Sequence, residues 1–322
     1  MLSGTFRKGM IAVLLAAGVC TSCHPGKTLR FGRTVCDQQQ FPEMYLPAPT
    51  RPFSAVPPDT ALKARFTGGD LNAAYAVGLL EPLAEYIAVQ KAAGPQPTVE
   101  TRLRLLELSQ YITRRISLAA MEISAVSSEL DCEDEKLTQM ADYMRDKESR
   151  RETRLTVLSI IAAAISDIVP PFLPSGSERA GNIIAVSSGV AGATLGALIL
   201  FNEQKVAVEH PRNALRDVWE GKAHTDVFPP LIWYYLMHPN PAAPDSRSLR
   251  ERLLQRWQRF GQVEEPSNKE KAKLLALYFG DGGDYTTSEL YNRAAMYDQL
   301  EAYIRLINQD LTHLAASFEN LR

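Results

Sequence analysis

The chain has 322 residues, of which 45% are hydrophobic and 22% are charged, and its formal net charge is −2. This composition can form a packed core and excludes a chain that is disordered throughout. The near-neutral charge gives no electrostatic basis for binding a polyanion, so we expect no nucleic-acid function.

The first 23 residues have the organisation of a secretory signal peptide. Arg7 and Lys8 precede an apolar run, MIAVLLAAGVC, whose length of about eleven residues is too short to span a membrane. Ser22, a small residue, then stands directly before Cys23. This end of the run resembles the lipobox of bacterial lipoproteins, in which a cysteine after a small residue is acylated and becomes the first residue of the mature chain.

The resemblance implies that residues 1–22 are removed and that acylated Cys23 anchors the chain to membrane lipid. Cys20 fits the pattern less well, because the bulky Val19 precedes it. An ordinary cleaved signal or an uncleaved anchor is the alternative. An Asp directly after the acylated cysteine resembles an inner-membrane retention signal. This chain has His24 at that position instead. The resemblance therefore favours a cell-envelope protein that faces the periplasm, with the outer membrane as its anchor.

Two cysteines remain once the signal peptide and the acylated cysteine are set aside, Cys36 and Cys132. The periplasm is oxidising, so this pair predicts a disulfide. The bond closes a loop of about 95 residues, which loop-entropy arguments value at roughly 4–5 kcal/mol. Two unpaired thiols are the alternative.

Residues 23–66 contain seven prolines and therefore favour extended backbone over helix. We interpret this segment as a tether, or as an arm lying across the domain that follows. Residues 67–322 are predicted to form a single all-helical domain. In its first helix we expect Asp70 to be the N-cap and Pro82 to interrupt the helix.

Two long helices are predicted to form the body of this domain. Residues 98–153 lack Pro and Gly and carry apolar residues at helical spacing. The last helix, 286–321, has an apolar seam with alternating spacings of four and three, formed by Leu300, Ile304, Ile307, Leu311, Leu314, Phe318 and Leu321. Such a seam indicates lengthwise packing, with 98–153 as the expected partner. No segment shows a convincing strand pattern, so the predicted fold is all-α, an elongated bundle with long antiparallel helices.

A central apolar helical hairpin is predicted at residues 155–201. Its arms are 155–169 and 182–201, with a proline-rich turn between them. The second arm carries a stripe of small residues at four-residue intervals, Ser188, Gly192 and Gly196. Such a stripe lets another helix approach closely in a protein core or in lipid. Two positions therefore stay open for the hairpin, the centre of the bundle or a bilayer.

A basic amphipathic helix is predicted at residues 248–260. Its candidates for contact with a membrane surface are Arg250, Arg256, Trp257 and Arg259, which could lie on anionic lipid. The alternative is a solvated basic face with the aromatic residues turned to the core.

The sequence carries no recognisable catalytic or nucleotide-binding motif, so we expect no catalytic residue, no metal and no cofactor. The acidic stretch 128–135 contains carboxylate pairs that could act as acid and base, but a salt-bridged, solvated helix face is the simpler interpretation. The loop 280–284 could offer carboxylates to calcium, but it lacks the ligand spacing of an EF-hand and favours a Gly-rich turn.

These observations predict a non-enzymatic, lipid-anchored envelope protein that interacts with a partner through its long helices. The partner is an unidentified protein or a second copy of the chain. The alternative is a membrane-active protein whose apolar hairpin inserts and perforates a bilayer. This arrangement is similar in outline to α-helical pore-forming toxins, which carry an apolar head between long helices, and the similarity is architectural alone.

Overall fold

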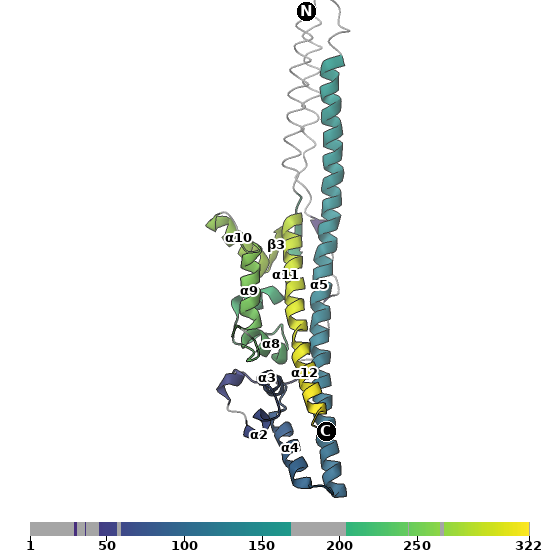
Figure 1. Cartoon of the computed structure of the whole chain (residues 1–322). Helices are drawn as coiled ribbons and strands as arrows, with labels where there is room; N and C mark the ends of the chain where they lie inside the picture. The colour runs from purple at the N-terminus through teal and green to yellow at the C-terminus, as the bar shows by residue number, and fades with distance from the viewer. Residues whose placement is uncertain are drawn as a thin grey trace, which may run out of the picture. The chain divides into compact units, whose positions relative to one another are not determined.

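The computed structural model describes residues 29–30, 36, 45–56, 59–168, 204–243, 245–264 and 267–321. Most of these residues are helical (Figure 1), which confirms the all-α class. The helices are η2 (Phe53–Ala55, a 3-10 helix), α2 (Thr60–Lys63), α3 (Gly68–Ala76), α4 (Leu80–Ala93), α5 (Val99–Ile168), α7 (Ala214–Glu220), α8 (Pro230–Met237), α9 (Leu249–Arg259), α10 (Asn268–Phe279), α11 (Thr287–Arg305) and α12 (Ile307–Glu319).

Three short strands accompany the helices, β1 (Leu29–Arg30), β2 (Val206–Glu209) and β3 (Gly282–Tyr285). They form one sheet in the order β1-β2-β3, and β1 pairs with β2 in parallel, with Leu29 opposite Val206. These strands were not predicted, because segments of two to four residues are too short to show an alternating pattern.

The described residues divide into two compact units. One unit contains 29–30, 140–168, 204–208 and 283–288, and the other contains the remaining described residues from 36 to 321. We call them the small unit and the large unit. Helix α5 contributes its residues 99–139 to the large unit and its residues 140–168 to the small one.

Helix α5 is longer than predicted. It has 70 residues, which corresponds to about 105 Å at 1.5 Å per residue. The predicted helix ended near residue 153, and 155–169 was expected to form a separate arm of a hairpin. The structure joins the two, because no Pro or Gly interrupts the chain before Pro170.

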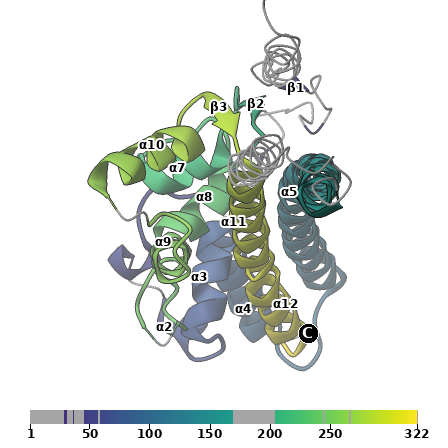
Figure 2. The same ribbon diagram turned by 90° about the horizontal axis from the view of Figure 1, so that it is seen from above.

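The large unit is built on antiparallel packing of α11 and α12 with the first part of α5. In Figures 1 and 2, α11 lies between α5 on one side and α8 and α9 on the other, and the chain direction of α11 and α12 opposes that of α5. This confirms the predicted long antiparallel helices. The apolar seam of the last helix is buried as predicted from Leu300 to Phe318.

The last helix nevertheless differs from the prediction in two respects. It is interrupted at Leu306, which separates α11 from α12. Its second half also packs against α3, and the Phe318 ring meets Tyr86 of α4 edge-on at 5.1 Å. The seam therefore serves several partners, not α5 alone.

The first helices of the large unit differ from the prediction in their N-cap and in the position of the break between them. Thr67, not Asp70, is the N-cap of α3, and in the capping box each of these two side chains accepts a hydrogen bond from the backbone N–H of the other residue. The break between α3 and α4 falls at Gly78, whose φ of +72° favours glycine, and not at Pro82. Pro82 lies in the first turn of α4, where a missing N–H is tolerated.

The described part of the Pro-rich segment packs onto the large unit as an arm. Leu46 and Phe53 are buried. The Leu46 N–H donates to Glu122 Oε2 at 3.1 Å, and the Phe53 N–H donates to the Tyr234 hydroxyl at 3.3 Å. These contacts agree with the interpretation of this segment as an arm lying across the domain.

The predicted disulfide between Cys36 and Cys132 is confirmed, with a Cα–Cα distance of 5.7 Å. It joins the arm to α5 across a sequence separation of 96 residues. A cross-link over so long a loop removes much conformational freedom from the unfolded chain.

Replacing Cys36 and Cys132 together by Ser should lower the free energy of unfolding by about 2–5 kcal/mol, because the unfolded chain regains the freedom that the loop had lost. Urea unfolding followed by circular dichroism measures the change. Reduced wild-type protein is the control and should match the double variant. Equal stability of the variant and the oxidised wild type would contradict the account.

Candidate interaction surface

The first part of α5 has one buried side and one exposed apolar side. Ile112 and Ile123 face the core and are fully buried. Leu103, Leu106 and Met121 lie on the opposite side of the helix, with 55%, 49% and 59% of their surface exposed. The outer side of an amphipathic helix normally carries polar and charged residues, so this exposed apolar side is a candidate interaction surface.

Small hydroxyl residues extend the exposed side toward the middle of the helix. Ser117, Ser124 and Ser128 each donate their hydroxyl hydrogen to a backbone carbonyl of the preceding turn, at 2.9–3.0 Å. Because these hydroxyls are already bonded within the helix, another backbone can approach without leaving a donor unsatisfied. We call Leu103, Leu106, Ser117, Met121, Ser124 and Ser128 the interaction face.

The end of α5 in the small unit is also apolar and exposed. Val157, Leu158, Ile160 and Ile161 are 49–62% exposed. Three exposed arginines, Arg150, Arg151 and Arg154, lie just before them on the same helix. Residues 155–161 are the part of the first hairpin arm whose side chains are described, and their large apolar side chains are exposed.

Several predicted sites fall outside the described residues. These are the signal peptide, the acylation site Cys23, and the stripe formed by Ser188, Gly192 and Gly196. Within the part of the chain that the structure describes, no helix combines the length and the apolar composition that a membrane crossing requires.

The four side chains of α9 that were predicted to contact a membrane surface differ in burial and in their contacts. Trp257 is fully buried, so its predicted contact with a membrane surface is wrong. Arg250 turns back to α7 and donates to the carbonyls of Val218 and Trp219 at 2.6 and 2.7 Å. Arg256 and Arg259 are exposed, so only these two can meet an anionic surface. The structure therefore favours the alternative of a solvated basic face with Trp257 in the core.

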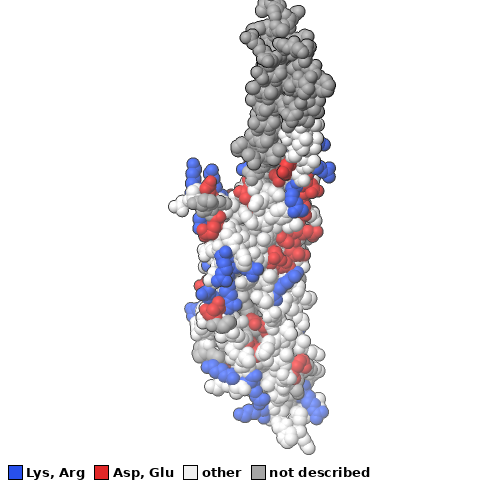
Figure 3. Space-filling view, turned by 45° about the horizontal axis from the view of Figure 1, so that its top comes forward, with Lys and Arg blue, Asp and Glu red and all other residues white. Residues whose placement is uncertain are grey.

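The acidic stretch on α5 forms ion pairs within the large unit. Glu129 pairs with Arg212, and Glu133 pairs with Lys136 at 2.5 Å. On the face drawn in Figure 3, many of the acidic side chains lie close together, and others lie apart from them. Burial, followed by the charges of Asp298 on α11 and of Asp131, raises the pKa of Asp134 to about 6. The cluster thus carries mutual repulsion at neutral pH.

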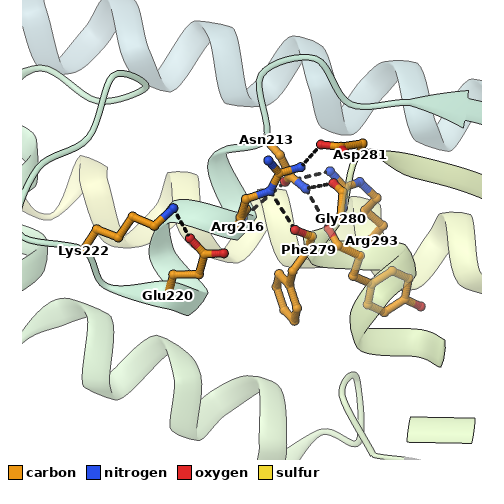
Figure 4. A network of polar contacts seen from close by, with 9 residues as sticks. Asn213, Arg216, Glu220, Lys222, Phe279, Gly280, Asp281 and Arg293 are labelled. Atoms are coloured by element: carbon orange, nitrogen blue, oxygen red, sulfur yellow. Dashed lines mark hydrogen bonds and ion pairs between the residues drawn. The ribbon is translucent and has the colours of Figure 1, made fainter. Parts of the chain in front are cut away.

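A buried polar network joins α7, α11 and the loop after α10 (Figure 4). Asn213 caps α7, and its side-chain amide donates to the carbonyls of Tyr278 and Gly280 at 3.0 and 2.9 Å. Arg293 of α11 is fully buried and donates to the Tyr278 carbonyl and, at 3.0 Å, to Asn213 Oδ1. This arrangement holds three segments together through hydrogen bonds to backbone carbonyl groups.

The loop 280–284 takes part in this network. Arg216 donates to the Phe279 carbonyl at 2.8 Å and pairs with Asp281 at 2.5 Å. Burial and the nearby Arg293 guanidinium lower the pKa of His210 to about 2, so this imidazole is neutral at physiological pH. The described residues contain no group of three His, Cys, Asp or Glu side chains that could hold a metal ion.

The role of Arg293 was not predicted from the sequence, although the signal was present. Leu290, Arg293, Tyr297 and Leu300 follow one another at spacings of three and four, and all are buried. A charged residue on the apolar side of a predicted helix indicates a buried polar network.

Comparison with protein-family models, with curated proteins and with solved structures gives no match for this chain.

Replacing Asp134 by Asn should stabilise the large unit at pH 7 by about 1 kcal/mol after allowance for solvent screening. The pKa of the Asp134 carboxyl is higher in the folded chain than in the unfolded chain, so its protonation stabilises the fold at low pH. This stabilisation is lost as the pH rises through 6. The gain from Asp134→Asn should therefore shrink as the pH falls from 7 to 4.

Urea unfolding of both proteins across this pH range measures the difference. The variant Asp226→Asn removes one charge at an exposed position and serves as the control. A gain that is constant from pH 7 to pH 4 would show that ionisation of Asp134 is not the cause.

Proposed function

We propose that this chain is a lipid-anchored protein of the bacterial envelope that binds a helix of a partner on the interaction face of α5. The partner helix belongs to another envelope protein or to a second copy of the chain. The observation that carries the proposal is the exposed apolar face on α5, opposite the side that packs on the core.

The spacing of the interaction face supports a helical partner. From Leu103 to Ser128, steps of three and four residues connect the face, with Gln110 and Arg114 completing the series. A stripe with this spacing runs along a helix and matches another helix lying lengthwise against it. The small serines allow close contact, and the larger Leu and Met side chains supply apolar area.

The disulfide and the arm support an envelope location and a short anchor. Disulfides persist in oxidising compartments such as the periplasm. Thirteen positions separate Cys23 from Cys36 in the sequence. A chain of this length spans at most about 47 Å. An acylated Cys23 would therefore keep the large unit close to the membrane surface and present α5 to partners there.

Photo-cross-linking in the native envelope tests the proposal and captures the partner in the same experiment. A photoreactive residue at 106 or at 121 should form a covalent adduct, because both positions lie on the interaction face. A photoreactive residue at 260 is the matched control, since Phe260 is an apolar residue, 65% exposed, at the C-cap of α9. It should form no adduct.

A second variant tests whether the face acts as a unit. Leu106→Glu should reduce the adduct formed from position 121 at least tenfold, because a carboxylate must then be buried in the contact. Its free energy of unfolding should change by no more than about 0.5 kcal/mol, as for other surface substitutions. Absence of adducts at both positions, or equal adducts at 260, would contradict the proposal.

A second candidate function is membrane contact through the end of α5 in the small unit. Exposed arginines beside exposed large apolar side chains form the pattern of a segment that lies on or enters an anionic bilayer. This observation favours the membrane-active alternative for the hairpin 155–201.

Liposome cosedimentation tests this second candidate. The Cys23→Ser chain, which lacks the acyl anchor, should bind vesicles containing phosphatidylglycerol. Replacing Ile160 and Ile161 together by Glu should weaken binding at least tenfold, because two large apolar side chains no longer enter the bilayer. Val99→Glu, at the other end of α5 where the side chain is 82% exposed, is the control and should bind like its parent. Equal binding by all three proteins would rule out this contact.

A further inference from the structure

Helix α12 packs against α3 in the large unit, and an ion pair joins the two helices. Nδ1 of His313 on α12 lies 2.5 Å from Oδ1 of Asp70 on α3. The Asp70 side chain is 1% exposed, whereas the His313 side chain is 63% exposed. A buried carboxylate is therefore paired with an imidazole that exchanges its proton with solvent, so the charge of the pair depends on pH.

Asp70 keeps its negative charge across the physiological pH range. Its Oδ2 accepts hydrogen bonds from the N–H and the hydroxyl of Thr67 at 2.9 and 2.8 Å, and from the Ser317 hydroxyl at 3.2 Å. Burial opposes ionisation, but the hydrogen bonds from His313 and Thr67 outweigh it and hold the pKa of Asp70 below its usual range. Changes of charge at this contact therefore come from α12.

Asp310 adds a second carboxylate, one turn before His313 on α12. Its Oδ2 accepts a hydrogen bond from Asn240 Nδ2 at 2.6 Å, which ties α12 to the segment between α8 and α9. Burial, followed by the charge of Asp70, raises the pKa of Asp310 to about 6. Tyr235 of α8 lies nearby and stays neutral, because burial raises the pKa of its hydroxyl.

His313 is the cation that acts on this second carboxylate. Arg247 and Arg252 line a small cavity beside Asp310, but Arg252 pairs with Asp245 at 2.6 Å and Arg247 donates to a glutamine of α9. Among the described residues, the cation that lowers the pKa of Asp310 is His313.

The charges of this group balance in weakly acidic solution and not in weakly basic solution. The hydrogen bond and the charge of Asp70, together with the charge of Asp310, raise the pKa of His313. At low pH, protonated His313 balances Asp70 while Asp310 is neutral. As the pH rises, His313 loses its proton and Asp310 ionises, so two carboxylates repel each other at the contact.

The two raised pKa values act in the same direction. A pKa that is higher in the folded chain stabilises the fold below the unfolded pKa, and this stabilisation is lost as the pH rises through the folded value. It is lost between about pH 4 and pH 6 for Asp310, and above about pH 6.5 for His313. The lowered pKa of Asp70 acts below about pH 4, outside this range.

We propose that Asp70, Asp310 and His313 form a pH-sensitive latch between α3 and α12. The latch holds α12 closed in weakly acidic solution and loosens it in weakly basic solution. Opening would uncover the apolar side of α12, on which Leu314 is fully buried.

Hydrogen exchange of the backbone amides of α12, measured by mass spectrometry on the full chain, tests the latch. After correction for intrinsic exchange at each pH, the opening equilibrium constant should be at least fivefold larger at pH 8 than at pH 5. A shift of one pKa unit corresponds to a tenfold change in this constant. Amides of α9, which carries none of the three side chains, are the internal reference and should change less.

Two variants should act in opposite directions. His313→Gln removes the cation and should open α12 at least fivefold more at pH 5, with a smaller effect at pH 8. Asp310→Asn removes the second carboxylate and should open α12 at least fivefold less at pH 8. His224→Gln, at an exposed histidine of the large unit, is the matched control and should match the wild type at both pH values.

Three results would overturn the proposal. The first is a change in α12 opening of less than fivefold between pH 5 and pH 8. The second is an equal change in α12 and α9, which would show unfolding of the whole unit. The third is an equal effect of His313→Gln at both pH values, which would make the pair a fixed hydrogen bond.

Discussion

The structure depends on the fact that α5 packs on only one of its sides. Its residues from Leu108 to Leu137 include a continuous series of buried apolar side chains, and α11 lies along that side in the large unit. Leu103, Leu106 and Met121 on the opposite side have nothing to pack against within the described residues. The helix that organises the core therefore also displays an exposed apolar face.

A disulfide and several hydrogen bonds hold the segments that do not pack along the buried side of α5. The disulfide at Cys132 attaches the arm, and Glu122 on the same helix accepts a hydrogen bond from the arm's backbone. Arg293 and Asn213 hold the loop after α10 through hydrogen bonds to its carbonyl groups. The acidic stretch around Asp134 opposes this order, because its carboxylates repel those of α11. The net stability is thus sensitive to pH at the contact between α5 and α11.

Much of this architecture could be predicted from the sequence. The absence of Pro and Gly predicted α5, and the alternating seam predicted the buried side of α11 and α12. The disulfide followed from counting cysteines in an oxidising compartment. The break at Gly78 could not be found in this way, because Pro82 is an equally good breaker by composition and only the tertiary fold places it in a first turn. The position of Arg293 on the apolar side of its helix indicates a buried polar network, but the sequence does not show which carbonyl groups it bonds.

Helix α9 and the end of α5 show why composition alone does not identify a membrane-binding segment. Both combine arginines with large apolar residues, and both fit the pattern of an amphipathic surface helix. In α9, Trp257 and Leu253 find a core, and Arg250 finds the end of α7, so little apolar surface remains for lipid. At the end of α5, Ile160 and Ile161 stay exposed beside solvated arginines. The difference lies in what the rest of the chain offers as a packing partner, which buries Trp257 and Leu253 of α9 and leaves Ile160 and Ile161 exposed.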